Sequence, residues 1–186
     1  LVDQKDFPVA ALNESGLGDT GDVWRSVQTA IADHCAGTVS YTRDGYGEVR
    51  RSASGRRDAE RIVSELRTRL RASGYAPPYV LVGHSLGGLY MQYFARRYPG
   101  DVRGLVLVDS MHAHQLDRVK AATPGIYRMT NLLTMLRGGI MRREFLGIRS
   151  TTAELEALPK SARLPTIVLS SIPRCLRSLS RPAIGL

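Results

Sequence analysis

Short apolar segments alternate along the chain with longer segments in which apolar residues recur at the spacing of a helix. Five of the short segments are rich in β-branched residues and predict strands. They cover residues 9–12, 38–41, 79–82, 105–108 and 166–169. Because these segments are continuously apolar rather than alternating, we expect strands that are covered on both faces, as in a parallel sheet.

Helical patterns fill most of the intervals between these predicted strands. Apolar residues three or four positions apart predict helices over residues 23–31, 59–70 and 86–94. Gly74 and Pro99 supply end signals for the second and third of these helices. The alternation of strands and helices predicts right-handed βαβ units, and therefore an α/β fold with a doubly wound, mostly parallel sheet.

Residues 111–164 break this alternation because they contain no good strand candidate. Helical patterns at 126–136 and 142–148 predict an insertion between two strands, in the position of a cap or lid over the sheet edge. Peripheral helices without such a role are the alternative. The chain accordingly divides into a first core part (1–110), the helical insertion (111–164) and a last strand with an irregular tail (165–186).

The insertion is also where we expect substrate choice to lie. Six of its apolar side chains indicate either an acyl-accepting cavity or simple helix packing. They are Leu132, Leu133, Met135, Leu136, Ile140 and Met141.

The length and composition fit one globular domain, or two at most, and exclude several classes of protein. The 186 residues are 43% hydrophobic and 23% charged, which excludes wholesale disorder. No apolar run approaches the roughly 18 residues of a membrane-spanning helix, so no transmembrane segment is expected. Two cysteines, Cys35 and Cys175, are too few for a disulfide scaffold and do not indicate a redox compartment.

The positive charge is unevenly distributed. Residues 1–80 are neutral, so residues 81–186 carry the whole net charge of +9. This balance indicates either an anionic partner or an arginine-rich solvated surface. No basic run is interleaved with aromatic residues on which bases could stack, so we expect no nucleic-acid binding.

The clearest chemical signal is a Gly-x-Ser-x-Gly motif formed by Gly83, Ser85 and Gly87. It lies between a predicted buried strand and a predicted amphipathic helix, which is the context that a nucleophile turn requires. In such a turn the serine hydroxyl points out above the sheet, and side chains at the two glycine positions would collide with the strand and the helix. The following helix favours negative charge at its N-terminus. We therefore predict a nucleophile at Ser85, with an ordinary glycine-rich turn as the alternative.

The chain resembles the α/β-hydrolase fold family, in which Gly83-His84-Ser85-Leu86-Gly87-Gly88 is a common form of the nucleophile turn. Further segments that support the resemblance are 14–18, 41–47 and 104–110.

The resemblance implies that the backbone N–H groups of Leu17 and Leu86 are the two oxyanion donors. It also shows two departures from the family pattern. Ser15 stands where the family often has histidine, and Asp44 follows Arg43 where the family has Asp before Arg.

The activity that the resemblance implies is acyl transfer from a small ester-like substrate, as in an esterase or a related serine hydrolase. Ser85 attacks the carbonyl, a histidine takes the proton and a carboxylate orients the histidine. No metal and no organic cofactor is required by this mechanism.

The acid and the base of such a triad are harder to assign. The family places its base near the chain end, but no histidine follows His114, so no base is identified. His112 and His114, which follow a predicted strand, are possible substitutes. Asp109 at the end of that strand is the candidate acid, with a loop-capping role as the alternative.

Five predicted strands where the family has eight, together with the missing base, indicate an incomplete chain. The sequence starts at Leu1, and residues 172–186 show no helix or strand period. Unpaired sheet edges would then favour aggregation. We expect a cytoplasmic location, with a targeting segment upstream of Leu1 as an open alternative. The sequence does not indicate an oligomeric state.

Two other functions stay open at this point. Gly16, Gly18 and Gly21 form a Gly-x-Gly-x-x-Gly pattern after a strand, with Asp44 after the next one, as in a nucleotide-binding oxidoreductase. Asp19 inside that loop argues against a bound phosphate. The missing base favours the second alternative, a non-catalytic binding protein of the same fold whose basic insertion contacts an anionic partner.

Overall fold

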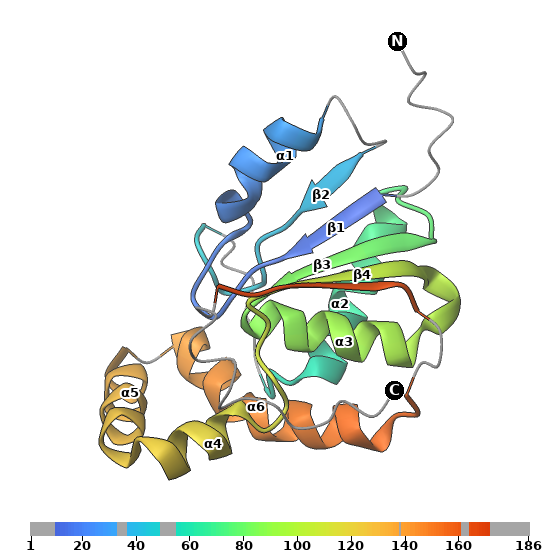
Figure 1. Ribbon diagram of the computed structural model, residues 1–186. Helices are drawn as coiled ribbons and strands as arrows, with labels where there is room; N and C mark the ends of the chain where they lie inside the picture. The colour runs from blue at the N-terminus through green and yellow to red at the C-terminus, as the bar shows by residue number, and fades with distance from the viewer. Residues whose placement is uncertain (1–9, 33–36, 49–54, 138, 161–163, 172–186) are drawn as a thin grey trace.

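The computed structural model describes residues 10–32, 37–48, 55–137, 139–160 and 164–171. Within them, five strands form one parallel sheet in the order β2-β1-β3-β4-β5 (Figure 1). The strands are β1 (Ala10–Glu14), β2 (Thr38–Ser40), β3 (Tyr79–His84), β4 (Val102–Val108) and β5 (Thr166–Leu169). The predicted α/β fold with a parallel sheet is therefore confirmed.

Helices cover the sheet unequally. They are η2 (Gly21–Trp24), α1 (Arg25–Ile31), α2 (Ala59–Ala72), α3 (Leu86–Arg97), η3 (Pro99–Asp101), α4 (Gln115–Ala122), α5 (Pro124–Arg137) and α6 (Gly139–Ala157). α2 and α3 lie under one face of the sheet, while α1 lies on the other side, beside β2 (Figure 1). No helix in the described part of the chain has both the length and the apolar character needed to cross a bilayer.

Local sequence explains why α2 forms where it does. The carboxylate of Asp58 accepts a hydrogen bond from the N–H of Arg61 (3.3 Å) and so caps the first turn. The apolar stripe of the helix is buried in the hydrophobic core, where α2 packs against α3 and α6. Its members are Ala59, Ile62, Val63, Leu66 and Leu70. The helix ends just before Gly74, whose φ of +82° a residue with a side chain rarely adopts.

The chain order places a crevice at one edge of the sheet. β1 is hydrogen-bonded to β3, with Glu14 beside Gly83, and β2 lies on the other side of β1. The connections out of β1 and β3 therefore leave in opposite directions. In parallel sheets such a topological switch point opens a crevice at the carboxyl ends of the two strands, and ligands bind there.

The insertion between β4 and β5 consists of α4, α5 and α6. α6 packs against α2 and α3 through the buried Ile148 and Leu155. The hydroxyl of Thr151 accepts a hydrogen bond from the N–H of Ala59 (2.9 Å), so it satisfies a donor in the first turn of α2. α6 is longer than the predicted helix at 142–148, and α4 was not predicted.

β5 differs from the other strands because its side chains are exposed. Ile167, Val168 and Leu169 are 59%, 65% and 53% exposed. The prediction that all five strands are covered on both faces is therefore wrong for β5. The described helices lie under the neighbouring strands, and β5 forms one edge of the sheet. Val9, Cys35, Cys175 and the predicted irregular tail lie outside the described residues.

Candidate active site

Ser85 occupies a strained turn between β3 and α3. Its φ is +51° and its ψ is −120°, a conformation that costs a residue with a side chain roughly 1–3 kcal/mol. Its N–H donates to the carbonyl of Val108 (3.1 Å), and its carbonyl accepts from the N–H groups of Gly88 (3.0 Å) and Met111 (2.9 Å). The side chain is partly exposed and lines a cavity. Three backbone hydrogen bonds thus fix the turn, while the Ser85 side chain stays accessible from the cavity.

The two glycines of the motif are required by close backbone contacts. A Cβ on Gly83 would lie 2.5 Å from the Cα of Gly88. A Cβ on Gly87 would lie 2.5 Å from the carbonyl oxygen of Ser15. Because backbone atoms cannot give way as a flexible side chain can, neither position accepts a larger residue without distortion. The second contact also presses the first turn of α3 against the loop that follows β1.

That loop lies directly against Ser85. A Cβ on Gly16 would be 3.4 Å from the Cβ of Ser85 and 3.3 Å from Nδ1 of His84. Among the described residues, the N–H of Leu17 has no hydrogen-bond acceptor. The N–H of Leu86 belongs to the first turn of α3, where intrahelical acceptors are lacking. The segments beside Ser85 therefore offer two N–H groups that could bind an oxyanion.

Hydrogen bonds of Ser15 and Trp24 fix the conformation of the loop after β1. The Ser15 hydroxyl donates to the carbonyl of Thr20 (2.9 Å) and accepts from Nε1 of Trp24 (3.1 Å). The N–H of Ser15 donates to the carboxylate of Glu14 (3.1 Å). Ser15 and Trp24 are both buried, so these bonds are not exchanged with water and the loop has one well-defined path.

Arg43 holds the same loop from the side of the core. Its guanidinium donates to the carbonyls of Ser15 (2.7 Å) and Gly16 (2.6 Å), and it pairs with the carboxylate of Glu14. Arg43 is only 2% exposed. Burial alone lowers the pKa of Arg43, but Glu14 and Glu144 together raise it well above the ordinary value. The guanidinium therefore stays charged.

Glu144 of α6 completes a buried ionic network. Its Oε1 accepts from Nε of Arg43 (3.1 Å) and pairs with Nη2 of Arg57 (3.4 Å), and its Oε2 accepts from the hydroxyl of Tyr46 (3.0 Å). Glu144 is fully buried. We did not predict this network from the sequence. The only sequence signal was Glu14, a charged residue at the end of an apolar strand.

An open cavity of about 920 Å³ lies beside Ser85 along the ends of β3, β4 and β5. Asp109, the predicted acid, lines this cavity and is exposed. Its φ is +40°, and its Oδ1 accepts a hydrogen bond from the N–H of Ser171 (2.6 Å). That bond lowers the pKa of the Asp109 carboxyl, and His84 adds a smaller effect in the same direction. Asp109 therefore shares the cavity with Ser85, but its carboxylate is bonded to the end of β5.

No described histidine is placed as a base for Ser85. Nδ1 of His84 lies 4.0 Å from a carboxylate oxygen of Asp19, on the loop after β1. His112 lines the cavity, but its Nδ1 accepts a hydrogen bond from the N–H of His114 (3.1 Å). A neutral ring in this arrangement carries its proton on Nε2 and has no free basic nitrogen. Burial, with Arg118 and His114, also lowers the pKa of His112. His34 lies outside the described residues.

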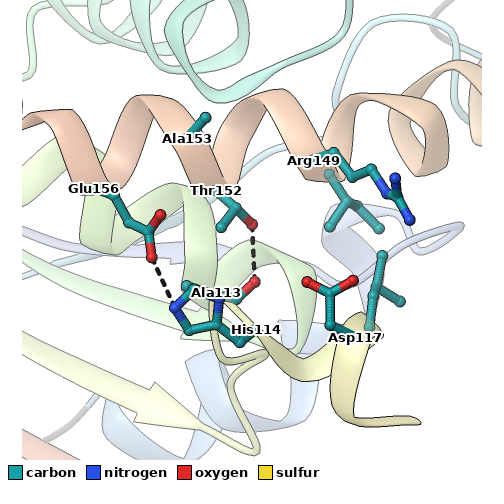
Figure 2. A pocket seen from close by; sticks show the side chains of 9 residues that line it. Ala113, His114, Asp117, Arg149, Thr152, Ala153 and Glu156 are labelled. Atoms are coloured by element: carbon teal, nitrogen blue, oxygen red, sulfur yellow. Dashed lines mark hydrogen bonds and ion pairs between the residues drawn. The ribbon is translucent and has the colours of Figure 1, made fainter. Parts of the chain in front are cut away.

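His114 lies in a separate pocket of about 320 Å³, between the start of α4 and α6 (Figure 2). Its Nε2 pairs with the carboxylate of Glu156 (2.8 Å), and the hydroxyl of Thr152 donates to the carbonyl of Ala113 (3.0 Å). Both contacts join the loop before α4 to α6, as Figure 2 shows. His114 is therefore engaged as a tether of the insertion and not as a partner of Ser85.

The apolar residues predicted to form an acyl-accepting cavity divide into two groups. The three leucines of α5, at 132, 133 and 136, are more than half exposed, and Met135 of the same helix is half-buried. Ile140 and Met141 at the start of α6 instead contact the loops near the site. A Cβ on Gly45 would lie 3.0 Å from Ile140, and one on Gly18 would overlap the end of Met141. α6 rather than α5 thus lies over these loops.

The residues of the Gly-x-Gly-x-x-Gly pattern, which would bind a nucleotide, make other contacts in the structure. Asp44, which that interpretation would place on a ribose, pairs with Arg69. The loop between Gly16 and Gly21 contains Asp19, and at its start the carbonyls of Ser15 and Gly16 are bonded to Arg43. In the part of the chain that the structure describes, no three His, Cys, Asp or Glu side chains come together as metal ligands would.

Comparison with known proteins identifies relatives of this chain. The profile of the alpha/beta hydrolase family matches residues 15–180. The uncharacterized protein YqjL of Bacillus subtilis (strain 168) is 33% identical over 101 residues, which covers 54% of this chain and 39% of that protein. The putative carbamate hydrolase RutD of Escherichia coli O127:H6 is 35% identical over 104 residues, which covers 56% of this chain and 38% of RutD. The matches thus span less than two fifths of either relative.

Solved structures show the same arrangement of elements. A marine microorganism esterase superposes with a TM-score of 0.62 at 14% identity, over 92% of this chain and 81% of its own. At that identity the likeness concerns the fold alone.

Proposed function

The chain belongs to the alpha/beta hydrolase family, and on that premise we propose that it is a serine hydrolase acting on an ester-like or related acyl bond. The nucleophile is Ser85, which forms an acyl-enzyme. One observation carries the proposal: the strained φ of +51° at Ser85, in a turn fixed by three backbone hydrogen bonds and open to a cavity. Backbone strain of this kind persists only where the surrounding structure imposes it, and strained residues are enriched at functional sites.

The proposed reaction begins when the Ser85 hydroxyl attacks the substrate carbonyl. As the tetrahedral oxyanion forms, the N–H groups of Leu17 and Leu86 donate to it, and each such donor contributes on the order of 3 kcal/mol to catalysis. Ser85 is the N-cap of α3, so the positive end of the helix dipole also faces the developing charge. Collapse of the oxyanion expels the alcohol, and water later releases the acyl group.

The proton of Ser85 needs an acceptor, and this part of the site is incomplete in the described chain. His84 faces Asp19, His112 has its Nδ1 bonded to a backbone N–H, and His114 pairs with Glu156. We assign Asp109 as the acid that would orient a base, because it lines the cavity that Ser85 lines. Without a base to accept this proton, we expect the substrate to acylate Ser85 slowly.

The substrate we propose is a small ester-like molecule. One of the relatives above supports this class, since RutD is named a putative carbamate hydrolase and a carbamate is cleaved at an acyl carbonyl. We further propose that residues 111–164 form a cap domain that selects the acyl group. Ile140 and Met141 support this role because they lie over the loops at Gly18 and Gly45.

A second candidate is a non-catalytic binding protein with the same fold. The observation that favours it is the placement of His84, His112 and His114, each of which is turned to another partner. The basic insertion would then contact an anionic ligand, since residues 81–186 carry the net charge.

Labelling with a fluorophosphonate separates the two candidates, because the probe reacts with activated serines. We expect the probe to modify the unaltered chain at Ser85 alone and to leave Ser85→Ala unmodified. Ser110→Ala is the matched control, since Ser110 lines the same cavity in an ordinary backbone conformation. It should be labelled as the unaltered chain is. Absence of labelling at Ser85 in a folded chain would favour the binding protein.

A further inference from the structure

Arg43 connects three segments that are far apart in the sequence. It lies in the loop after β2, it donates to two carbonyls of the loop after β1, and its Nε donates to Glu144 of α6 (3.1 Å). Glu144 is 101 positions further along the chain. Both side chains are almost completely buried, so the bonds between them are not in competition with water.

The bond to Gly16 sets the direction of the proposed oxyanion donor. The carbonyl of Gly16 and the N–H of Leu17 belong to one planar peptide group and point in opposite directions. Nη2 of Arg43 holds that carbonyl at 2.6 Å on the core side. The N–H of Leu17 must therefore point away from the core. If Arg43 moved, this peptide group would be free to rotate, and the donor would lose its direction.

Glu144 in turn determines where Arg43 can be. It is bonded to Arg43, Arg57 and Tyr46. A shift of α6 that withdrew Glu144 would leave the buried Nε–H of Arg43 without its acceptor, which is unfavourable even though Arg43 keeps its ion pair with Glu14. The start of α6 also touches the loop after β1 directly, because Met141 packs against Gly18. Two separate contacts thus transmit the position of α6 to the same loop.

We propose that Arg43 is a positioning residue through which α6 controls the Leu17 donor. With α6 seated, Glu144 holds Arg43, and Arg43 holds the Gly16–Leu17 peptide in the direction that receives an oxyanion. With α6 displaced, that peptide loosens. The catalytic meaning of this coupling rests on the proposed function. The coupling itself is a physical link between two segments and is measurable without any reaction.

Amide hydrogen exchange on the full chain measures the link. The reporters are the N–H groups of Ser15 and Asp19, which are bonded to Glu14 (3.1 Å) and Gly16 (3.3 Å) inside the loop. In Glu144→Gln, which keeps the size of the side chain and removes its charge, we expect exchange at both reporters to accelerate about tenfold or more. Exchange in β3 should stay as it is in the unaltered chain.

Glu154→Gln is the matched control on the same helix. Glu154 pairs with the exposed Arg56 (3.4 Å), and in the part of the chain that the structure describes it has no contact with Arg43. Its substitution should leave the loop reporters unchanged. A purely structural role of Glu144 would accelerate exchange within α6 and leave Ser15 and Asp19 unaffected, and that result would overturn the proposal. Equal acceleration in both variants would overturn it as well.

The unaltered chain provides a second test if Glu144→Gln does not fold. In hydrogen exchange at increasing denaturant concentrations, all below the unfolding midpoint, the loop reporters and the amides of residues 144–148 should open as one unit, with the same free energy of opening. Separate opening of the two segments would overturn the coupling. Failure of Ser85 to react with a fluorophosphonate, with coupled exchange intact, would reject the proposed function and leave the coupling supported.

Discussion

The carboxyl ends of β1 and β3 are built very differently from those of β4 and β5. At β1 and β3, backbone packing and a buried ionic network hold Ser85 and the loop beside it from several directions. At β4 and β5, Asp109 is exposed, and two hydrogen bonds to the end of the neighbouring strand hold it: its N–H donates to the carbonyl of Leu169 (2.8 Å), and its carboxylate accepts from the N–H of Ser171. We call these the nucleophile side and the acid side of the site.

The difference shows how much support each catalytic role requires. An oxyanion site works only if its donors point in the right direction before the charge appears, so rigidity on the nucleophile side matches the proposed chemistry. An acid–base pair needs a histidine held by a carboxylate. The acid side contains Asp109 without such a histidine among the described residues. Under the proposed mechanism, the nucleophile side is therefore prepared for attack, whereas no histidine among the described residues is placed to transfer the proton.

The largest expected effect tests the network on the nucleophile side. Replacement of Arg43 by Met removes the cation that Glu14 and Glu144 share and leaves Glu14 buried without its ion-pair partner, so the free energy of unfolding should fall by about 4 kcal/mol. Urea unfolding followed by circular dichroism measures it. Arg25→Met is the control, because Arg25 and its partner Asp22 are exposed, and it should cause no measurable loss. Equal stability of the two variants would contradict the network's importance.

A pair of strand glycines gives the next comparison. Gly83→Ala should destabilise the fold by about 2 kcal/mol because its Cβ meets the backbone of Gly88. Gly104→Ala in β4 meets only the carbonyl of Pro165, at an ordinary 3.6 Å, and should be neutral or slightly stabilising. The denaturant midpoints of the two variants measure the difference. A similar loss at both positions would mean that the nucleophile side is no more tightly packed.

Strain at Ser85 predicts a smaller change. Ser85→Gly should be more stable than Ser85→Ala by about 1 kcal/mol, because glycine adopts a φ of +51° without the cost that any side chain incurs. Both variants lack the hydroxyl, so their difference isolates the backbone. Thermal unfolding of the two under identical conditions measures it. Equal midpoints would show that the turn is not strained.

The smallest effect concerns the pH dependence on the acid side. The pKa of Asp109 is lowered in the folded chain, so this group stabilises the fold at higher pH and ceases to do so as the pH falls through the lowered pKa. Asp109→Asn should therefore lose slightly less stability than the unaltered chain between pH 5 and about pH 3. Urea midpoints over that range measure the difference, and parallel curves would contradict the assignment.

Periodicity and β-branched runs predicted all five strands and the three core helices with small errors at their ends. For β1, β3, β4, α2 and α3 the reason is that apolar side chains are buried there. α1 and β5 were predicted from apolar patterns although α1 has no buried residue and the side chains of β5 are exposed. The second half of α6 escaped prediction, since it is anchored by polar contacts such as Thr151 to the N–H of Ala59. α4 has no buried residue, so its sequence carries no clear apolar period.

The candidate site was predictable where the motif carries its own geometry and unpredictable elsewhere. Gly83 and Gly87 could be inferred because a tight turn excludes side chains. The contact between Arg43 and Glu144 joins residues 101 positions apart, and nothing local in the sequence encodes it. The exposure of β5 was not predicted for a related reason, because an apolar segment predicts a strand but not whether a helix packs against it.

Chemical rescue by imidazole tests the central claim most directly, because it supplies from solution the base that the described residues lack. The cavity of about 920 Å³ beside Ser85 is large enough to admit it. We expect imidazole to accelerate fluorophosphonate modification of the Ser85 peptide by at least about tenfold, with no modification in Ser85→Ala at any imidazole concentration. An imidazole effect of the same size in Ser85→Ala, or no modification of Ser85 in the folded chain under either condition, would contradict the claim that this turn presents a nucleophile.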